Sequence, residues 1–218
     1  MQESNASLPL LTVLTKCLNM NKATQRLQDQ EQLKKLIIEQ SRIIIEEEGW
    51  SALSIRKIAD AIGYSVPVIY KHFSSKDELI EYFTKEGFEM LTTQLIAAIK
   101  TNDSPADKIS HLAAAYWVFA FTHQKHYEIM FGVGIPTCEA IQSVSEKRKT
   151  SDVMYGAISD AVAHSGRTHI DLHLKVKTFW SIMHGLVAIE LLSNNQKSIQ
   201  PSAIMNDAID GYIKSLIN

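Results

Sequence analysis

Hydrogen-bond donors and small apolar side chains lie together in a short segment near residue 70. The donors are a phenol, two ammonium groups and an imidazole: Tyr70, Lys71, His72 and Lys76. Each can donate to a phosphate oxygen, and phosphates of nucleic acids accept from hydroxyl, amine and ring N–H groups. Three apolar residues precede the donors: Val66, Pro67 and Val68. Since small apolar side chains can contact thymine methyl groups, the segment indicates contact with duplex DNA.

Two short helices joined by a tight turn would position these side chains. Ser54 is placed to cap the first helix. The buried face of that helix would hold residues at helical spacing: Ile55, Ile58, Ala59 and Ile62. Gly63 ends the first helix, and Ser65 offers a second cap with Pro67 in the next opening turn. The second helix is predicted from Val66 to Phe73, which gives a helix-turn-helix whose second helix enters the major groove.

This segment resembles the DNA-binding domain of the tetracycline-repressor (TetR) family. The family pattern is roughly T-x-x-x-I-A-x-x-A-G-V-S-x-G-T-L-Y-x-H-F-x-S-K-E-x-L, and the chain matches it at Ile58, Ala59, Gly63, Ser65, Tyr70, His72, Phe73, Ser75, Lys76, Glu78 and Leu79. The chain has Pro67 and Val68 where a Gly-Thr pair is common, so methyl contact would have to replace a hydrogen bond to a base. The resemblance implies that Ser54, Arg56 and Ser65 also lie at the DNA.

The resemblance implies a three-helix DNA-binding head at residues 29–75. Its first helix would run from Asp29 to Glu48, with one apolar face: Leu33, Leu36, Ile37, Ile44 and Ile45. Residues 1–28 are interpreted as an N-terminal extension, a mobile arm, because they lack sustained helical periodicity. Alternatively, Met20 is the natural start, since the resemblance begins only about ten residues later. The intact mass of protein made from the native gene tests this alternative.

The remaining residues, 76–218, are predicted to form a larger helical body for ligand binding and dimerisation. A helix from Ser75 to Lys100 would link head and body, and the loop T-N-D-S-P follows at Thr101 to Pro105. Further helices are predicted at 106–122, 126–131, 138–164, 169–192 and 202–216. Because no alternating strand pattern is present, the fold class is all-α with about nine helices.

Part of this body is similar to the TetR-type regulatory domain named for a Trp-His-Gly signature, here Trp180, His184 and Gly185. The resemblance implies a homodimer that pairs through the last two helices, with Gly185 permitting close approach. The predicted seam consists of Phe179, Ile182, Leu186, Ile189, Ile209, Tyr212, Ile213 and Leu216. The alternative for each of these residues is a place in the protomer's own core.

The family also implies a pocket for a small-molecule effector, whose identity the sequence does not give. Aromatic and soft side chains on the body helices could form a mostly apolar wall. The candidates are Tyr116, Trp117, Phe121, Met130, Tyr155 and Met183. At helical spacing, such residues also serve simply as core.

Composition is consistent with a globular DNA-reading protein. The formal net charge of the 218 residues is −2. Residues 22–76 carry nine basic and seven acidic side chains, whereas residues 77–218 carry twelve and sixteen, so the head is the more basic part. The two cysteines lack metal or disulfide spacing, and no apolar run approaches the roughly 18 residues of a membrane span. A cytoplasmic location is therefore expected.

The predicted function is a ligand-responsive regulator, most often a repressor in this family, that binds a palindromic operator as a dimer. It needs no cofactor, and the catalytic motifs of common enzyme classes are absent. A metal-responsive regulator would also fit the sequence, because the pairs His123/His126 and His169/His173 have helical spacings able to share an ion. The same sequence is compatible with a non-specific nucleoid binder and, less so, with an all-α enzyme.

Overall fold

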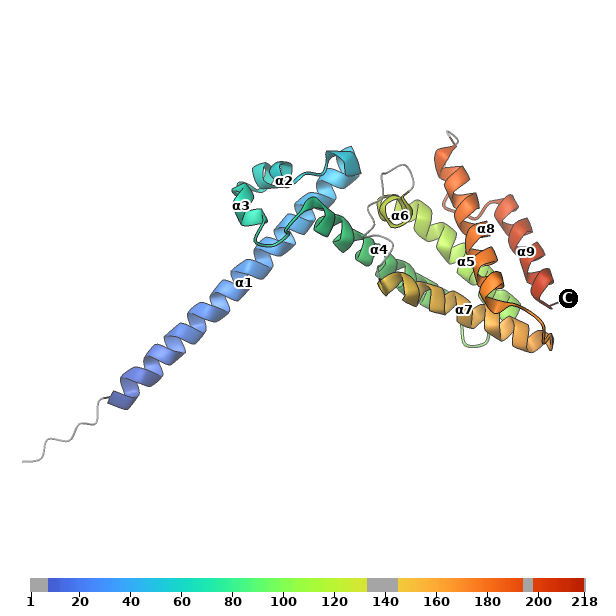
Figure 1. The fold of residues 1–218 in the computed structure, drawn as a ribbon, viewed down its shortest axis with the longest axis horizontal. Helices are drawn as coiled ribbons and strands as arrows, with labels where there is room; N and C mark the ends of the chain where they lie inside the picture. Colours follow the sequence, from blue (N-terminus) through green and yellow to red (C-terminus); the bar gives the residue numbers. More distant parts are fainter. Residues whose placement is uncertain (1–7, 133–144, 194–197, 218) are drawn as a thin grey trace, which may run out of the picture. The chain divides into compact units, whose positions relative to one another are not determined.

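The computed structural model describes residues 8–132, 145–193 and 198–217, with side chains described from residue 24 onward. These parts contain nine α-helices and a 3₁₀ turn and no strand, as the sequence predicts (Figure 1). The chain divides into two compact units, one ending at Lys76 and one beginning at Asp77. No helix within the described ranges is long and apolar enough to cross a membrane.

The first unit is the helix-turn-helix head. It consists of α1 (Leu8–Glu48), the 3₁₀ turn η1 (Trp50–Ala52), α2 (Ile55–Ile62) and α3 (Val66–Ile69). Helix α2 packs on both α1 and α3. The core of this unit is made of buried apolar side chains: Ile37, Ile44, Ile45, Trp50, Leu53, Ile58, Ile69 and Phe73. Residues 66–75, from the start of α3 to the start of α4, are called the recognition segment below. Burial of the apolar set holds this segment at a fixed place relative to α1 and α2.

Helix α1 begins much earlier than the sequence pattern predicts. It starts at Leu8 instead of Asp29 and runs for 41 residues. Pro9 occupies the first turn, where its missing N–H costs nothing, and no glycine or proline follows before Gly49. The prediction required a periodic apolar face, which the sequence of residues 1–28 lacks, whereas a helix can also form from residues of adequate helix propensity.

Helix α3 is shorter than the predicted span from Val66 to Phe73. The α-helix ends at Ile69 after four residues, because three of the four are β-branched and the fourth is proline. Tighter turns continue the segment: the Lys71 N–H donates to the Val68 carbonyl at 3.2 Å and the His72 N–H to the Ile69 carbonyl at 2.9 Å, each three residues back. The predicted cap at Ser65 is wrong, since its side chain makes no capping hydrogen bond.

The second unit is the helical body. Its helices are α4 (Lys76–Ala98), α5 (Pro105–Thr122), α6 (Gln124–Phe131), α7 (Ser145–Ser165), α8 (Leu172–Leu192) and α9 (Ala203–Ile217). The loop prediction at Thr101 to Pro105 is confirmed, because Ser104 and Asp107 form a capping box with Pro105 in the first turn. The first residues of the helix predicted from Cys138 lie outside the described residues.

Helix α5 forms the centre of the body. It packs against α6, α7, α8 and α9, and Tyr116, Trp117 and Phe119 on it are almost completely buried. Helices α4 and α7 are joined by a hydrogen bond between Thr92 Oγ1 and Thr150 Oγ1, 2.7 Å apart. Thr150 is itself fully buried. The body thus has one continuous core in which α7 contacts α4 and also α8.

Candidate functional site

Local hydrogen bonds fix the backbone of the recognition segment. The Ser54 hydroxyl accepts from the Lys57 N–H at 3.2 Å, which confirms the predicted cap of α2. Gly63 follows α2 with a φ of 72°, in the left-handed region that glycine tolerates best. These two features set where α2 ends and where α3 begins. The helix-turn-helix geometry is therefore encoded by Ser54 and Gly63.

Most of the predicted DNA-binding side chains reach solvent in the head. The exposed ones are Ser54, Arg56, Ser65, Pro67, Tyr70 and Lys71, and the half-buried ones are Val66, Val68, His72 and Lys76. Tyr70 exposes 50% of its surface, a high value for an aromatic residue beside a core position such as Ile69. An exposed phenol next to an exposed ammonium can donate to adjacent phosphates.

Lys76 differs from the other predicted contacts. Its ammonium group donates to the backbone carbonyl of Trp50 at 3.3 Å. Trp50 is buried in the head and begins the 3₁₀ turn after α1. Lys76 therefore ties the end of the recognition segment to the core turn, a structural role that the motif match did not reveal.

A groove between α1 and α3 adds residues that the sequence analysis did not select. Its volume is about 430 Å³, and it is lined by Leu27, Gln30, Glu31, Leu33, Lys34, Val68, Lys71 and His72. The Lys34 ammonium lies 5.5 Å from the centre of the Phe73 ring. Lys34 is exposed on α1, and the fold places it with Lys71 and His72 in the lining of this groove.

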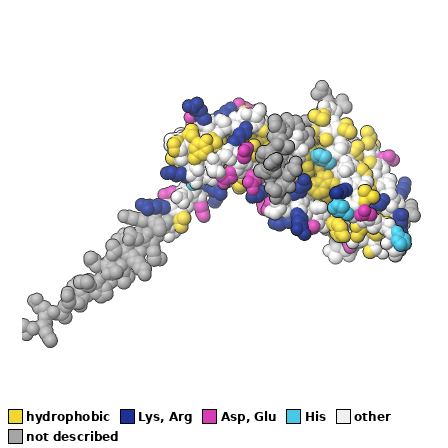
Figure 2. All heavy atoms as spheres, viewed as in Figure 1, with side chains coloured by type: hydrophobic (Ala, Val, Ile, Leu, Met, Phe, Trp, Pro, Cys, Tyr) yellow, Lys and Arg dark blue, Asp and Glu magenta, His cyan; other side chains and the backbone are white. Residues whose placement is uncertain are grey.

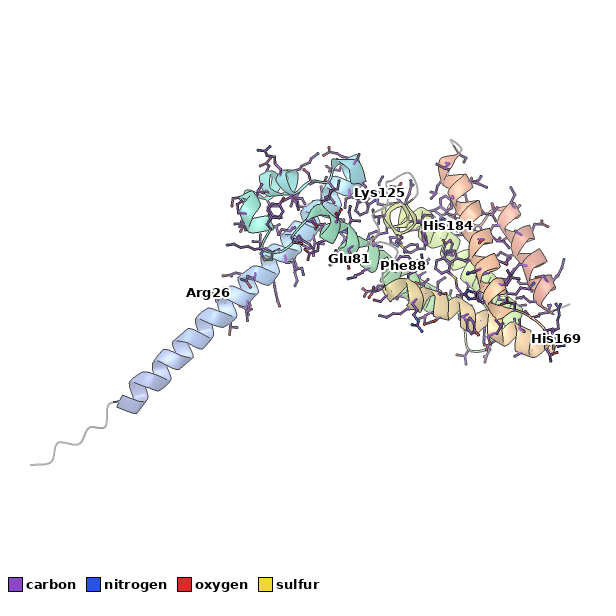
Figure 3. All side chains as sticks on the ribbon, viewed as in Figure 1. Arg26, Glu81, Phe88, Lys125, His169 and His184 are labelled. Carbon is purple, nitrogen blue, oxygen red and sulfur yellow. The ribbon has the colours of Figure 1, made fainter. Side chains whose placement is uncertain are left out.

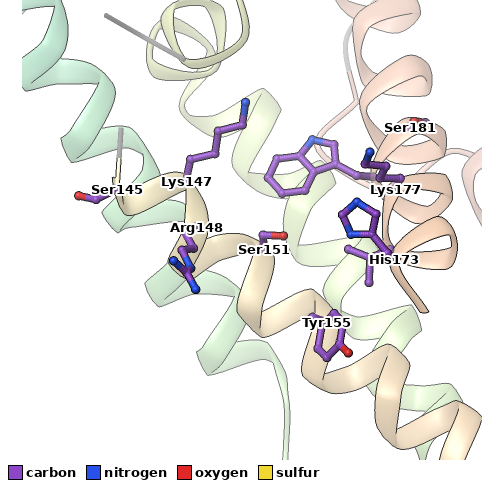
Figure 4. A pocket seen from close by; sticks show the side chains of 10 residues that line it. Ser145, Lys147, Arg148, Ser151, Tyr155, His173, Lys177 and Ser181 are labelled. Carbon is purple, nitrogen blue, oxygen red and sulfur yellow. The ribbon is translucent and has the colours of Figure 1, made fainter. Parts of the chain in front are cut away.

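The body contains a larger cavity between α7 and α8, with a volume of about 830 Å³. Its lining combines cations, hydroxyls and rings: Ser145, Lys147, Arg148, Ser151, Tyr155, His173, Val176, Lys177, Trp180 and Ser181. Figure 4 shows Lys147 and Arg148 on α7 and His173 and Lys177 on α8. Three of the lining residues, Lys147, Arg148 and Lys177, are permanent cations, a feature that the sequence pattern did not predict.

Only one predicted pocket residue, Tyr155, lines this cavity. Tyr116, Trp117, Met130 and Met183 are buried in the hydrophobic core. Phe121 is partly buried and packs on the same core. Helical spacing of aromatic residues identified core positions here, because it cannot distinguish a cavity wall from a packed interior.

The signature residues Trp180 and His184 lie in an aromatic cluster beside this cavity. Figure 3 labels His184 in the helical body. Its Nδ1 is 2.6 Å from the Tyr127 hydroxyl and 3.4 Å from the Tyr116 hydroxyl. The Phe131 ring packs against both Trp180 and His184. Burial raises the pKa of both phenols, and burial together with the nearby Lys147 lowers the pKa of His184. The neutral imidazole therefore accepts a hydrogen bond from Tyr127 at neutral pH.

The predicted dimer residues divide into two groups. Phe179, Ile209, Tyr212, Ile213 and Leu216 are buried in the core of the single protomer. Ile182 and Leu186 are half-buried, and Ile189 exposes 67% of its surface. Ile204 on α9, which was not predicted, exposes 68%. Hydrophobic side chains thus reach the surface in the region of α8 and α9 (Figure 2).

The histidine pairs do not form a metal cluster. His126 Nε2 is bonded to a Glu86 carboxylate oxygen at 2.8 Å, next to His123. His169 precedes α8, so the helical spacing assumed for it and His173 is wrong. The described residues contain no group of three side chains able to hold a metal ion.

Comparisons with known proteins match both units. A family model described as bacterial regulatory proteins of the tetR family matches residues 37–83, and one described as tetracyclin repressor-like, C-terminal domain, matches residues 109–212. The Trp-His-Gly subtype stays a prediction. The HTH-type transcriptional activator FasR of Mycolicibacterium smegmatis is 25% identical over 199 residues, which cover 89% of this chain and 85% of FasR.

Solved structures share the fold. A protein of unknown function from Rhodococcus sp. RHA1 has a TM-score of 0.69 at 21% identity, covering 85% of this chain and 96% of its own. The transcriptional regulator FadR from Bacillus subtilis, solved in complex with stearoyl-CoA, has a TM-score of 0.66 at 16% identity, covering 82% and 97%. At these identities the likeness concerns the fold alone.

Proposed function

Because the chain belongs to the TetR family of bacterial transcriptional regulators, we propose that it binds a palindromic operator as a homodimer and responds to a small-molecule effector. The observation that carries the proposal is the exposed recognition segment on a fixed helix-turn-helix backbone. Tyr70 and Lys71 are exposed there directly after α3. The enzyme reading is set aside, since the family and the relatives are regulators.

The contacts divide into two kinds. Ser54, Arg56, Tyr70 and Lys71 hold phosphates and so set affinity and register, with Lys34 and His72 of the α1–α3 groove supporting them. Val66, Pro67 and Val68 approach the base edges, where they favour thymine methyl groups. Ser65 and Lys76 are the remaining predicted DNA contacts. Lys76 also stabilises the head through its hydrogen bond to the Trp50 carbonyl.

The exposed apolar surface of α8 and α9 supports the homodimer. Ile189 and Ile204 expose about two thirds of their surfaces, which is unfavourable in a monomer. A Cβ placed at Gly185 or Gly211 would meet no atom within 4 Å, so a second helix has room to approach closely at both positions. Pairing these helices across a two-fold axis presents two recognition segments to two half-sites.

The cavity between α7 and α8 is the proposed effector site. Its volume of about 830 Å³ lies in the range of small-molecule sites. FadR of Bacillus subtilis, with the same fold, was solved with stearoyl-CoA, which makes an acyl-CoA a reasonable first compound to test. An effector can change DNA affinity only as far as it binds the DNA-binding and the DNA-released forms of the protein with different affinities. The coupling free energy is typically about 1–3 kcal/mol.

The direction of regulation is proposed from the family, in which repression is the commoner mode. FasR, by contrast, is named an activator. A reporter gene placed downstream of the operator decides between them. Deleting the regulator should raise expression if it represses, and a fall in expression would identify an activator.

Selection of random duplex DNA by the purified protein at a stated salt concentration is the decisive test. The expected result is an inverted repeat, and retention without sequence preference would contradict the proposal in favour of a nucleoid binder. The variant Lys71→Gln should reduce retention strongly. Lys100→Gln, which removes an exposed charge just after α4 and outside both proposed interfaces, is the matched control and should leave retention unchanged.

A further inference from the structure

The cavity between α7 and α8 gathers positive charge from both of its walls. Lys147 and Arg148 come from α7, and Lys177 comes from α8, with His173 one turn before it (Figure 4). Within the described parts of the chain, none of the three permanent cations forms an ion pair with a carboxylate. All three side chains are exposed, and an anion bound between them would be attracted by each of these like charges.

The described lining of the cavity contains no compensating acid. Helix α8 contains no aspartate or glutamate before Glu190, near its end. Asp171 at its start accepts a hydrogen bond from the Leu174 N–H and so serves as the helix cap. On α7 the carboxylate of Glu146 is bonded to Ser145 Oγ and does not line the cavity. The positive charge at the cavity therefore comes from lining residues of both helices, since the three acids of α7, Glu146, Asp152 and Asp160, lie outside the lining.

The rest of the lining suits an anion attached to a less polar part. Hydroxyl groups of Ser145, Ser151 and Ser181 can donate to carboxylate or phosphate oxygens. Val176 is buried, and the half-buried ring of Trp180 packs against Phe131 at the wall. One part of the cavity thus offers charge and donors, and another offers apolar surface.

We propose that this cavity binds a molecule that carries a carboxylate or phosphate on an apolar body, with Lys147, Arg148 and Lys177 holding the anionic group. The inference rests on the proposed function because it takes the same cavity as the effector site and adds the chemical class of the effector. Three features of the described residues carry it: cations without ion pairs on two facing helices, a lining without acids and the adjacent apolar wall.

Titration calorimetry with three ten-carbon probes tests the proposal: decanoate, decyl phosphate and decanol. The two anions should bind at least tenfold more tightly than the neutral alcohol, and their ratio tells whether a carboxylate or a phosphate is preferred. Binding should change the emission of Trp180 and lose this change in Trp180→Phe, which locates the probe in the cavity. Equal binding of all three probes, or binding of none, would overturn the proposal.

Two matched triple variants separate the cavity cations from general charge. Lys147→Gln/Arg148→Gln/Lys177→Gln should weaken binding of the preferred anion at least tenfold. Lys100→Gln/Lys149→Gln/Lys214→Gln removes the same charge from exposed positions outside this cavity and should leave binding unchanged. Equal losses in both variants would contradict a specific site. No DNA is present in this experiment, so a failed operator selection and a failed anion test are distinguishable.

Discussion

Single residues of the head combine structural and binding roles to different degrees. Among the described residues, Lys71 is exposed and makes no hydrogen bond to the core, whereas Lys76 donates to the Trp50 carbonyl. The motif match treats both simply as positive residues near phosphates. The physical difference is whether the ammonium group also satisfies a buried backbone carbonyl, and only the folded structure shows that.

The variants Lys71→Ala and Lys76→Ala should therefore differ in their effects on DNA affinity and on the free energy of unfolding. Lys71→Ala should weaken binding to all DNA sequences and reduce the slope of log K against log salt by about 1. Its effect on the free energy of unfolding should stay within about 0.5 kcal/mol. Lys76→Ala should in addition lower that free energy by about 1–2 kcal/mol through the lost hydrogen bond. Urea unfolding and salt-dependent DNA titration measure the two effects, and equal stability of both variants would contradict this division.

His184 should make the stability of the body depend on pH. Burial is the main reason that its pKa in the folded protein is lowered from the ordinary 6.5, and Lys147 adds to the effect. The unfolded chain then binds more protons than the folded chain between the two pKa values. Stability is therefore complete above about pH 6.5 and is lost as pH falls from there through the lower folded value.

Unfolding of the wild type and of His184→Asn between pH 5 and 8 measures this contribution. Asparagine places an acceptor near the position of Nδ1 without a titrating ring, so the variant should lose less stability on acidification. His164→Asn, at an exposed position of α7, is the control and should follow the wild type. A His184→Asn curve parallel to that of the wild type would refute the assignment.

Contacts between helices were the part of the fold that the sequence specified least. Ser54, Gly63 and the loop at Thr101 to Pro105 predicted helix ends correctly, because capping, turns and the left-handed conformation depend on neighbours in sequence. The length of α1 was missed, because the prediction required a periodic apolar face, which the sequence of residues 1–28 lacks. The cavity lining was missed apart from Tyr155, because the charged positions of α7 and α8 become neighbours only after packing.

Two glycines on different helices should respond oppositely to alanine. A Cβ at Gly87 on α4 would lie 2.5 Å from Met130 Sδ and 3.3 Å from His126 Cβ on α6, whereas one at Gly156 on α7 would meet no atom within 4 Å. Gly156→Ala should stabilise the protein by about 0.5–1 kcal/mol through helix propensity. Gly87→Ala should destabilise it by about 1 kcal/mol, since overpacking exceeds that gain.

Urea unfolding of both variants at one protein concentration gives the comparison. The double variant Gly87→Ala/Met130→Ala supplies the mechanism check, because removing the thioether should make the added methyl group less costly than it is beside Met130. An increase in the free energy of unfolding for Gly87→Ala would show that α6 moves away from the added methyl group without loss of stability.

Assembly of the whole molecule depends on the surface that the protomer leaves uncovered. Five of the eight predicted seam residues belong to the protomer core, yet Ile189 and Ile204 remain exposed on the same two helices. The family resemblance supplied the two helices of the proposed interface, which stays a prediction. It could not identify the outward face, because each of these helices is apolar on more than one side.

The variant Ile189→Glu should dissociate the proposed homodimer and reduce operator affinity at least tenfold, since one head then engages a single half-site. Ile96→Glu changes an isoleucine of α4 that is 58% exposed and is the control. Sedimentation velocity gives the oligomeric state, and DNA titration gives the affinity. A monomeric wild type would rule out the dimer, and equal effects of both variants would place the interface elsewhere.

The hydrogen bond between Thr92 and Thr150 joins α4, which follows the recognition segment in the chain, to α7, which lines the cavity. Thermodynamic linkage is reciprocal: if an effector lowers operator affinity by some factor, the operator lowers effector affinity by the same factor. Operator DNA is then an antagonist of the effector. Protein saturated with operator duplex would then need a higher effector concentration for half-saturation than free protein does, by that same factor.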